Sequence, residues 1–197
     1  ITPSPKTPSQ RMKAFIGALF ITTLVWQACA QTSSQGAQAG TAAPALHLYQ
    51  TLPDAEETKL LRGIITKADI LTDTSFGWYQ KNLQYFKPNT EAVAAIKPKV
   101  GQVQIVLFAG TWCHDSQQIL PKYLSTLEAA GFNEEQLTII ACDRAKTTIA
   151  NLHRAFNITN VPTLVLLKNG KEVGRIVEYG NTALMDAELA TLFKKVE

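Results

Sequence analysis

The stretch VQIVLFAGTWCHDS, residues 103–116, decides the fold. Its first half, VQIVLFAG, is a short continuous apolar run, which is typical of a buried strand. The segment from Cys113 to Ala130 then suits a helix that contains Pro121. Cys113 therefore lies at a strand-to-helix turn, the part of an α/β sheet where sites open to solvent. The stretch raises the question of whether Cys113 is a nucleophile or a leftover thiol in a binding module.

Strand and helix patterns alternate in the sequence that follows. QLTIIACD, residues 136–143, is a second apolar strand pattern, and AKTTIANLHRAF, residues 145–156, is a second helical pattern. Two apolar runs within residues 162–180 are joined by Asn169-Gly170, the strongest short signal for a β-hairpin. An amphipathic pattern over residues 182–196 predicts a further helix. The order β-α-β-α-β-β-α predicts a three-layer α/β fold, with a mixed central sheet and helices on both faces.

Residues 46–101 predict a helical N-terminal extension packed on this main domain, which spans residues 102–197. In PDAEETKLLRGIITKA, residues 53–68, Asp54 is placed to cap a helix, and one helical face is apolar (Leu60, Leu61, Ile64 and Ile65). Residues 75–89 are rich in aromatic side chains, and are either a helix packed on the main domain or a ligand platform. TEAVAAIKPK, residues 90–99, predicts another short helix, which ends before Pro98.

Composition and charge exclude one class of function. An apolar content of 46% is normal for a globular core and argues against global disorder. The formal charge of +3 comes from 19 basic and 16 acidic residues, and the two signs balance from residue 31 onward. Because the domain has no basic cluster, it lacks the electrostatic footprint of a nucleic-acid-binding protein, and no nucleic-acid partner is expected.

Residues 1–30 resemble upstream sequence followed by a signal peptide. An uncharged and mostly apolar run, residues 14–26, leads to Ala28-Cys29-Ala30, which fits the small-x-small rule for cleavage. Cys29 also stands where bacterial lipoproteins are lipidated, although Trp26 replaces the preferred leucine. We expect export to the periplasm, an oxidising compartment, with a membrane-anchored lipoprotein as the alternative if Cys29 is lipidated. Residues 31–45, rich in Gly, Ala and Ser, predict a flexible linker.

Several motifs of the main domain occur at a characteristic spacing. FAGTWC fills the strand-to-helix turn, Pro121 follows Cys113 by eight residues, and Asn160-Val161-Pro162-Thr163 opens a strand before the hairpin LVLLKNGKEVGR. With these motifs, residues 102–196 resemble a thioredoxin domain. The chain is also similar to exported thioredoxin-like proteins of Gram-negative bacteria, which often carry helical N-terminal extensions. The resemblance implies that Val161-Pro162 is a cis-proline loop facing Cys113, where the Val161 backbone pairs with an extended substrate strand.

The sequence departs from the thioredoxin pattern at three points. The second active-site cysteine of the family falls on Ser116, so that the pair becomes Cys-x-x-Ser. The central Gly-Pro is replaced by His114-Asp115, and the buried aspartate that assists proton transfer in many members falls on Leu107. These changes argue against an ordinary dithiol reductase.

Cys113 is the expected nucleophile, and its neighbours are expected to modulate it. Unpaired N–H groups and the macrodipole at a helix N-terminus favour a thiolate. Ser116, one turn along, is expected to donate its hydroxyl to that anion, whereas Asp115 opposes it by like charge. His114 helps if it is protonated. Trp112 is either the apolar rim on which a substrate peptide lies or a plug at the edge of the sheet.

Cys142 is the thiol expected at the end of the neighbouring strand. Neighbouring strands are ~4.8 Å apart, but Cys113 lies beyond the end of its own strand, so we expect a gap too long for a relaxed disulfide. A buried, free Cys142 is therefore predicted. The alternative is a resolving cysteine that Cys113 reaches after local movement.

No metal site and no cofactor are expected. Cys113, His114 and Asp115 are adjacent, so their side chains cannot easily converge on one ion, and no second ligand cluster has zinc spacing. His153, in ANLHRAF, is expected to be an ordinary surface histidine, and His47 carries no signal. A hydrolase is disfavoured because no base and orienting group can be assigned.

The sequence thus predicts an exported monothiol thiol–disulfide exchange protein. In this interpretation Cys113 attacks disulfides or oxidised thiols of other proteins and forms a mixed disulfide. Because Ser116 cannot resolve that intermediate, an external reducing thiol or a redox partner must release it. The alternative is a non-catalytic thioredoxin-like module that keeps a groove for peptides.

Overall fold

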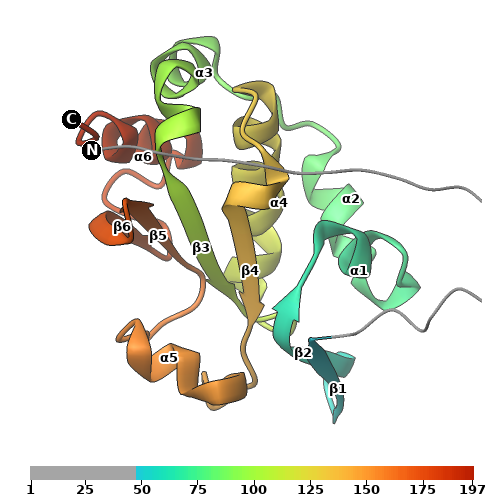
Figure 1. Ribbon diagram of the computed structural model, residues 1–197. Helices are drawn as coiled ribbons and strands as arrows, with labels where there is room; N and C mark the ends of the chain where they lie inside the picture. The colour runs from blue at the N-terminus through green and yellow to red at the C-terminus, as the bar shows by residue number, and fades with distance from the viewer. Residues whose placement is uncertain (1–47) are drawn as a thin grey trace, which may run out of the picture. The chain divides into compact units, whose positions relative to one another are not determined.

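Six strands form one mixed sheet in the computed structural model, which describes residues 48–197 (Figure 1). The strands are β1 (Tyr49–Asp54), β2 (Thr58–Ile65), β3 (Gln104–Ala109), β4 (Leu137–Ala141), β5 (Thr163–Lys168) and β6 (Lys171–Val177). Their order is β1-β2-β4-β3-β5-β6; β3 and β4 are parallel, and the other neighbouring pairs are antiparallel. The predicted signal peptide, the linker, Cys29 and His47 lie outside the described residues.

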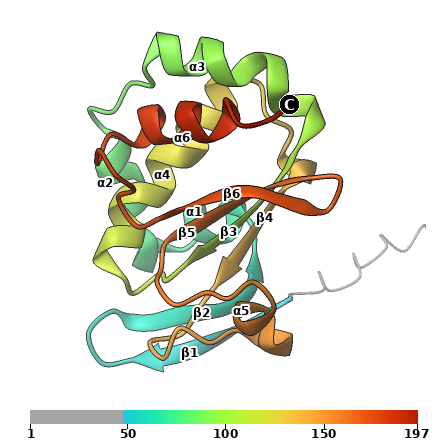
Figure 2. The same cartoon turned by 90° about the vertical axis from the view of Figure 1, so that its left-hand side faces the viewer.

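Helices lie on both faces of the sheet (Figures 1 and 2). They are α1 (Lys67–Leu71), α2 (Trp78–Leu83), α3 (Thr90–Ile96), α4 (His114–Ala129), α5 (Leu152–Ala155) and α6 (Met185–Phe193). Figure 2 shows α3, α4 and α6 on the same side of the strands, whereas Leu152 of α5 packs against the core cluster on the opposite side. The mixed sheet between two helical layers confirms the α/β fold predicted from the sequence.

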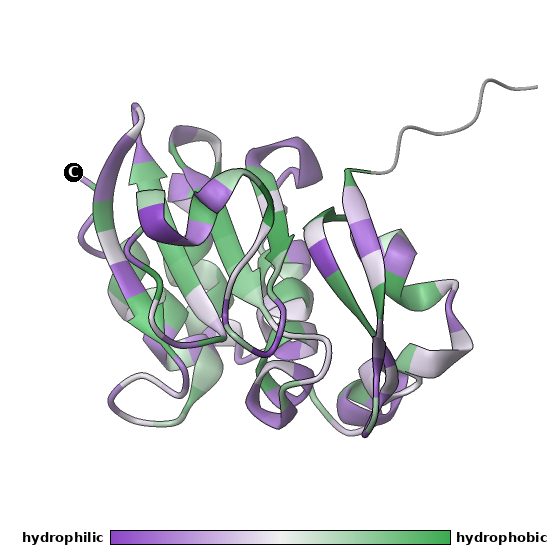
Figure 3. Ribbon diagram, turned by 90° about the horizontal axis from the view of Figure 1, so that it is seen from below, coloured by the Kyte–Doolittle hydropathy of each residue, from purple (hydrophilic) through white to green (hydrophobic). Residues whose placement is uncertain are grey.

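Side chains alternate across each strand and so divide the core into two clusters. The larger cluster joins the sheet to α4 and α6 and includes Ile105, Leu107 and Leu164. The smaller cluster lies on the α5 face and is formed by Val106, Phe108, Ile140, Cys142, Ile158, Val161 and Val165. Figure 3 shows hydrophobic residues concentrated in the central strands. Trp112 and Cys113 pack against the smaller cluster, so the predicted site borders the core.

The helix predicted over residues 53–68 is wrong, because this segment forms the turn and second strand of a β-hairpin. β1 pairs with β2 along its whole length, from Tyr49 opposite Gly63 to Asp54 opposite Thr58. β2 then pairs with β4, so the hairpin extends the sheet of the main domain. The N-terminal extension is therefore helical only from α1 onward, with η1 (Thr74–Phe76) and η2 (Lys97–Gln102) as 3₁₀ turns.

Pairing with β4 explains why the strand prevails over the helical pattern. Gly63 has a φ of +130°, and a Cβ there would meet the carbonyl oxygen of Leu48 at 2.5 Å, so the strand requires a glycine at this position. Leu61 and Ile65 still face the larger cluster, because a strand with period two also places them on one side. Asp54 does cap backbone N–H groups, but these belong to Glu56 and Glu57 in the hairpin turn.

The other elements follow the sequence patterns more closely. Residues 75–89 contain the predicted helix, α2, and both its Tyr79 and the preceding Phe76 are buried in the larger cluster. Asn169 and Gly170 have φ values of 51° and 73°, as a tight hairpin turn between β5 and β6 requires. The helix predicted over residues 145–156 shrinks to η4 (Ile149–Asn151) and α5, because Ala150 and Asn151 adopt left-handed backbone conformations.

Candidate active site

Cys113 is the residue that precedes α4, and its backbone is extended (φ −86°, ψ 121°). Its N–H donates to the carbonyl of Gly110 at 3.0 Å, and its own carbonyl accepts from the N–H of Gln117 at 2.9 Å. The side chain is half-buried, and Sγ donates to the carbonyl oxygen of Val161 at 3.3 Å. The thiol therefore lies at the N-terminus of a 16-residue helix, where the helix dipole favours an anion.

Ser116 holds the turn that carries Cys113. Its side chain is 1% exposed, and Oγ accepts a hydrogen bond from the N–H of Gly110 at 3.0 Å. No hydrogen bond joins Ser116 to Cys113 in the described part of the chain, and donation of the Ser116 hydroxyl to a Cys113 thiolate stays a prediction. Ser116 does fix the loop between β3 and α4, and so fixes the position of the thiol.

The loop that contains Val161 and Pro162 faces Cys113. The peptide bond between these two residues is cis, and the Val161 carbonyl receives the thiol hydrogen bond. The N–H of Glu178, after β6, donates to the Pro162 carbonyl at 2.7 Å, and the Asn160 amide donates to the Glu178 carboxylate at 2.8 Å. The end of β6 therefore anchors the loop beside the thiol.

Trp112 is held at the edge of the sheet by a hydrogen bond and by packing. Its Nε1 donates to the carbonyl of Cys142 at 2.9 Å, and the half-buried ring packs against the smaller cluster. The guanidinium carbon of Arg144 lies over the ring, 5.0 Å from its centroid, in a cation–π contact. These contacts are those of a plug at the sheet edge, one of the two roles considered for Trp112.

Two groups near the site were missed by the sequence reasoning. The guanidinium of Arg144 donates to both carboxylate oxygens of Asp54, at 2.6 and 2.8 Å. It also donates to a carboxylate oxygen of Glu56 at 2.9 Å. Tyr179 donates its hydroxyl to Asp115 at 3.0 Å. The acidic run after Pro53 is the available signal for the first pairing, although the same run also fits the first turn of a helix. No local pattern in the sequence marks the second.

Cys142 is completely buried, and both cysteines of the described region are free. Its N–H donates to the carbonyl of Ala109 at 2.8 Å, which continues the pairing of β4 with β3. Burial, assisted by the charge of Asp143, raises the pKa of the Cys142 thiol to about 12. Cys142 is therefore a protonated core residue and a poor nucleophile.

The histidines do not converge on the thiol. His114 is exposed, and Nδ1 of His153 accepts a hydrogen bond from the N–H of Thr148 at 3.3 Å, which is a structural role. Within residues 48–197, no group of three or more His, Cys, Asp or Glu side chains is arranged to hold a metal ion. Over the same residues, no helix has both the length and the apolar character needed to cross a membrane.

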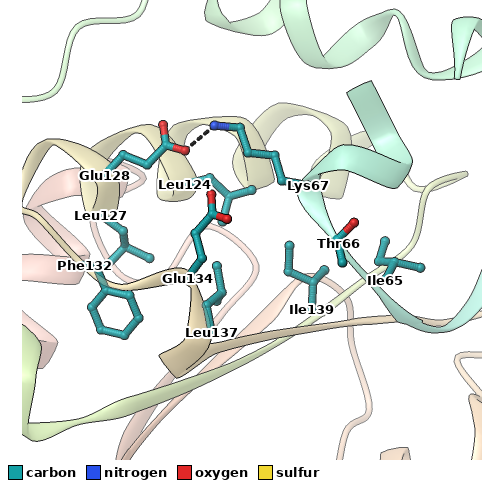
Figure 4. A pocket seen from close by; sticks show the side chains of 10 residues that line it. All are labelled: Ile65, Thr66, Lys67, Leu124, Leu127, Glu128, Phe132, Glu134, Leu137 and Ile139. Carbon is teal, nitrogen blue, oxygen red and sulfur yellow. Dashed lines mark hydrogen bonds and ion pairs between the residues drawn. The ribbon is translucent and has the colours of Figure 1, made fainter. Parts of the chain in front are cut away.

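A hollow at the other end of α4 does not include Cys113 (Figure 4). It has a volume of about 100 Å³ and lies among Leu124, Leu127, Phe132 and neighbouring apolar side chains, with an ion pair between Lys67 and Glu128. At a rise of about 1.5 Å per residue, Leu124 lies roughly 16 Å along the helix from Cys113. The hollow is therefore separate from the thiol site.

Comparisons with known proteins identify the family of this domain. The sequence model of the Thioredoxin family matches residues 90–191, just over half of the chain. The chain belongs to the thioredoxin family. Membership supports a thiol–disulfide redox role in general terms, with protein thiols or disulfides as the class of substrate. No curated protein sequence matches the chain.

Solved thioredoxin structures match this chain over most of their own length. Mitochondrial thioredoxin 3 from Saccharomyces cerevisiae is 24% identical over 54% of this chain and 89% of its own, with a TM-score of 0.35. The Schistosoma mansoni thioredoxin is 23% identical over 57% and 95%, with a TM-score of 0.36. Thioredoxin NaTrxh from Nicotiana alata is 25% identical over 53% and 82%, with a TM-score of 0.35.

The departures from the thioredoxin pattern are visible in the structure. Leu107, which replaces the buried aspartate of many thioredoxins, is fully buried in the larger cluster and has no group that moves protons. Ser116, in place of the second cysteine, is tied to Gly110. Among the described residues, the site therefore presents one accessible thiol, Cys113, and no thiol at the usual resolving position.

Proposed function

We propose that this chain is an exported thioredoxin-family protein of the monothiol type, which exchanges disulfides through Cys113. The observation that carries the proposal is the setting of the two described thiols. Cys113 is half-buried at the N-terminus of α4, while Cys142 is completely buried and protonated. Export to the periplasm is supported by the signal-peptide pattern of residues 14–30, and a lipoprotein anchored through Cys29 is the alternative.

The reaction has two exchange steps. In the first, the Cys113 thiolate attacks one sulfur of a substrate disulfide, a bond forms between the two sulfurs, and the other substrate sulfur leaves as a thiolate that takes a proton from water. In the second, the thiolate of an external thiol attacks the substrate sulfur of the mixed disulfide, and Cys113 leaves as a thiolate. The substrate sulfur becomes bonded to the external thiol, and a second external thiol reduces it.

The same site suits a protein cysteine oxidised to sulfenic acid. There the Cys113 thiol condenses with the sulfenic acid, a disulfide forms between them, and one water molecule leaves. An external thiol then regenerates Cys113 as above. The helix N-terminus suits both reactions because its unpaired N–H groups interact favourably with negative charge that develops on a sulfur atom there.

The position of the Val161 backbone supports a role in holding peptide substrates. Its carbonyl contacts Sγ, and its N–H makes no hydrogen bond to another described residue. An extended peptide can pair with these groups and so bring its own sulfur beside Cys113. Pro162, half-exposed Trp112, His114 and Asp115 surround the same thiol and are the residues proposed to contact or modulate the substrate.

Alkylation kinetics test the proposal directly. The rate of labelling of Cys113 by monobromobimane near neutral pH is compared with that of free cysteine, with Cys113→Ser as a blank and Cys142→Ala as a matched control. We expect Cys113 to react faster than the free amino acid, and the rate to be the same in Cys142→Ala. Labelling no faster than free cysteine would instead favour a peptide-binding module without redox activity.

A further inference from the structure

The tip of the β1–β2 hairpin is joined to the thiol site through Arg144. Asp54 ends β1, and its carboxylate holds Nε and Nη2 of Arg144 at 2.6 and 2.8 Å. Glu56, in the turn, holds Nη2 at 2.9 Å. A planar guanidinium with two bonds to one carboxylate is held in a fixed orientation, which a lysine cannot reproduce. The hairpin, which precedes the part of the chain that the Thioredoxin model matches, therefore sets where Arg144 lies.

The guanidinium is placed over the residue next to the nucleophile. Its central carbon lies 5.0 Å from the centroid of the Trp112 ring, and Trp112 directly precedes Cys113. The ring itself is fixed by the bond from Nε1 to the Cys142 carbonyl. Arg144 therefore covers part of the Trp112 ring, and a protein chain that crosses this ring on its way to Cys113 must pass the guanidinium.

Two exposed side chains of largely apolar character lie at the end of β6, beside the Val161–Pro162 loop. The ends of β6 and of the Val161–Pro162 loop lie together, since Val177 pairs with Thr163 and Glu178 bonds to Pro162. Val177 and Tyr179 are exposed there by 40% and 37%. A peptide that reaches Cys113 from this side meets apolar side chains and the free N–H of Val161, whereas one that crosses Trp112 meets an arginine already paired with two acids.

We propose that Arg144, held by Asp54 and Glu56, is a specificity-determining residue, which restricts the protein disulfides that reach Cys113 while leaving small disulfides unaffected. The inference rests on the proposed exchange activity. Protein substrates approach as extended or folded chains and need space on both sides of the reacting sulfur. A small disulfide needs only the thiol itself. The Arg144 side chain over Trp112 therefore affects the two substrate classes differently.

The double variant Asp54→Asn/Glu56→Gln tests the proposal. An asparagine keeps the side-chain oxygen that accepts from the N–H groups of Glu56 and Glu57, so the hairpin turn is retained while both charges that hold Arg144 are lost. Arg144→Gln removes the guanidinium that lies over the Trp112 ring. Glu172→Gln is the matched control, because it breaks a two-bond arginine–carboxylate pair with Arg175 at the other end of β6.

Rates of the first exchange step, the formation of a mixed disulfide at Cys113, are measured with a small neutral disulfide, 2,2′-dithiodipyridine, and with a protein disulfide, insulin. We expect the rate with insulin to rise about two- to fivefold in both test variants, the factor that corresponds to an exposed cation–π contact. The rate with dithiodipyridine should stay unchanged in all variants, and Glu172→Gln should match the wild type with both substrates. An unchanged or lower rate with insulin, or an equal rise with both substrates, would overturn the proposal.

A second readout keeps this test separate from the test of function. The rates at which Cys113 is alkylated by iodoacetamide and by a polymer-linked maleimide are compared in the same variants, and neither reaction requires turnover. We expect the ratio of the bulky to the small reagent to rise in Asp54→Asn/Glu56→Gln and in Arg144→Gln. An unchanged ratio of the two alkylation rates overturns the proposal that Arg144 restricts access to Cys113. Absence of exchange in the wild type, with a raised ratio in the variants, overturns the function alone.

Discussion

The phenolic hydroxyl of Tyr179 donates a hydrogen bond of 3.0 Å to Oδ1 of Asp115, two residues after Cys113. Burial raises the pKa of Tyr179, and so do the hydrogen bond to Asp115, the charge of Asp115 and that of Cys113. Tyr179 is therefore the proton donor in this pair throughout the neutral range. The bond joins the loop after β6 to the first turn of α4 and engages the negative charge next to the thiol.

Tyr179→Phe should slow the alkylation of Cys113 at neutral pH. Without the hydroxyl, the Asp115 carboxylate loses a partner and repels negative charge on the reacting Cys113 sulfur more strongly. For partly exposed charges this corresponds to about a two- to fivefold change in rate. Iodoacetamide kinetics measure it, and Tyr85→Phe, at a side chain 87% exposed, is the matched control. In an Asp115→Asn background the Tyr179 substitution should have no effect. An equal slowing in that background would mean that Tyr179 acts only by packing.

Ser116→Cys should create dithiol reductase activity that the natural protein lacks or nearly lacks. A thiol one helical turn from Cys113 attacks the mixed disulfide intramolecularly, with an effective concentration far above that of external thiols. The variant also loses the bond that Ser116 accepts from Gly110, so its free energy of unfolding should fall by about 1 kcal/mol. Insulin reduction and chemical denaturation measure the two effects. Equal insulin reduction by both proteins would show that another group already resolves the intermediate.

Cys142 should stay free and unlabelled in the folded protein. It is completely buried, and burial raises the pKa of its thiol to about 12, so both access and ionisation are lacking at neutral pH. Peptide mapping after alkylation should find Cys142 modified only when a denaturant is present, and Cys142→Ala should leave the exchange rate unchanged. A disulfide between Cys113 and Cys142 in the map of the oxidised protein would make this a two-cysteine enzyme.

Glu188 should give a pH-dependent contribution to stability. Burial alone acts to raise its pKa, but hydrogen bonds from Thr182 and Asn181 outweigh this and hold the pKa below the usual 4.5. Because the folded-state pKa is depressed, the contribution is present above pH 4.5 and is lost as the pH falls through the folded-state value.

Glu188→Gln should therefore lower the free energy of unfolding by about 1–3 kcal/mol at pH 7, as expected for hydrogen bonds to a charged group. The difference from the wild type should shrink below pH 4.5. Urea denaturation at pH 7, 5 and 4 measures it, and Glu91→Gln, at an exposed carboxylate, controls for a general effect of charge. A difference that stays constant over this range would contradict the assignment.

The sequence predicts the half of the molecule in which strands are continuous apolar runs and turns carry specific residues. VQIVLFAG is a local signal for a buried strand, and Asn169-Gly170 is a local signal for a hairpin turn. The structure has β3 and the β5–β6 turn at these residues. Residues 53–68 are different, because their apolar side chains fit either a helix or a strand. Pairing of β2 with β4, a contact between residues about 75 positions apart, decides between the two, and no local pattern contains it.

The same distinction applies to the site. Cys113, Trp112 and the Val161–Pro162 loop are predicted because their motifs are continuous in sequence. Arg144 and Tyr179 are not, because each acts through a partner far along the chain: Asp54 for the first and Asp115 for the second. The sequence predicts that Ser116 donates its hydroxyl to a Cys113 thiolate, but it does not predict that the same oxygen accepts from the N–H of Gly110 in the preceding turn.

The most direct test of the central claim is mass spectrometry of the intact protein after reaction with a protein disulfide under non-reducing conditions. Because the described site has no resolving thiol beside Cys113, a mixed disulfide through Cys113 should accumulate and persist until a small thiol is added. Cys113→Ser should form none. Failure to form an adduct at Cys113, with the thiol shown to be reduced beforehand, would contradict the account.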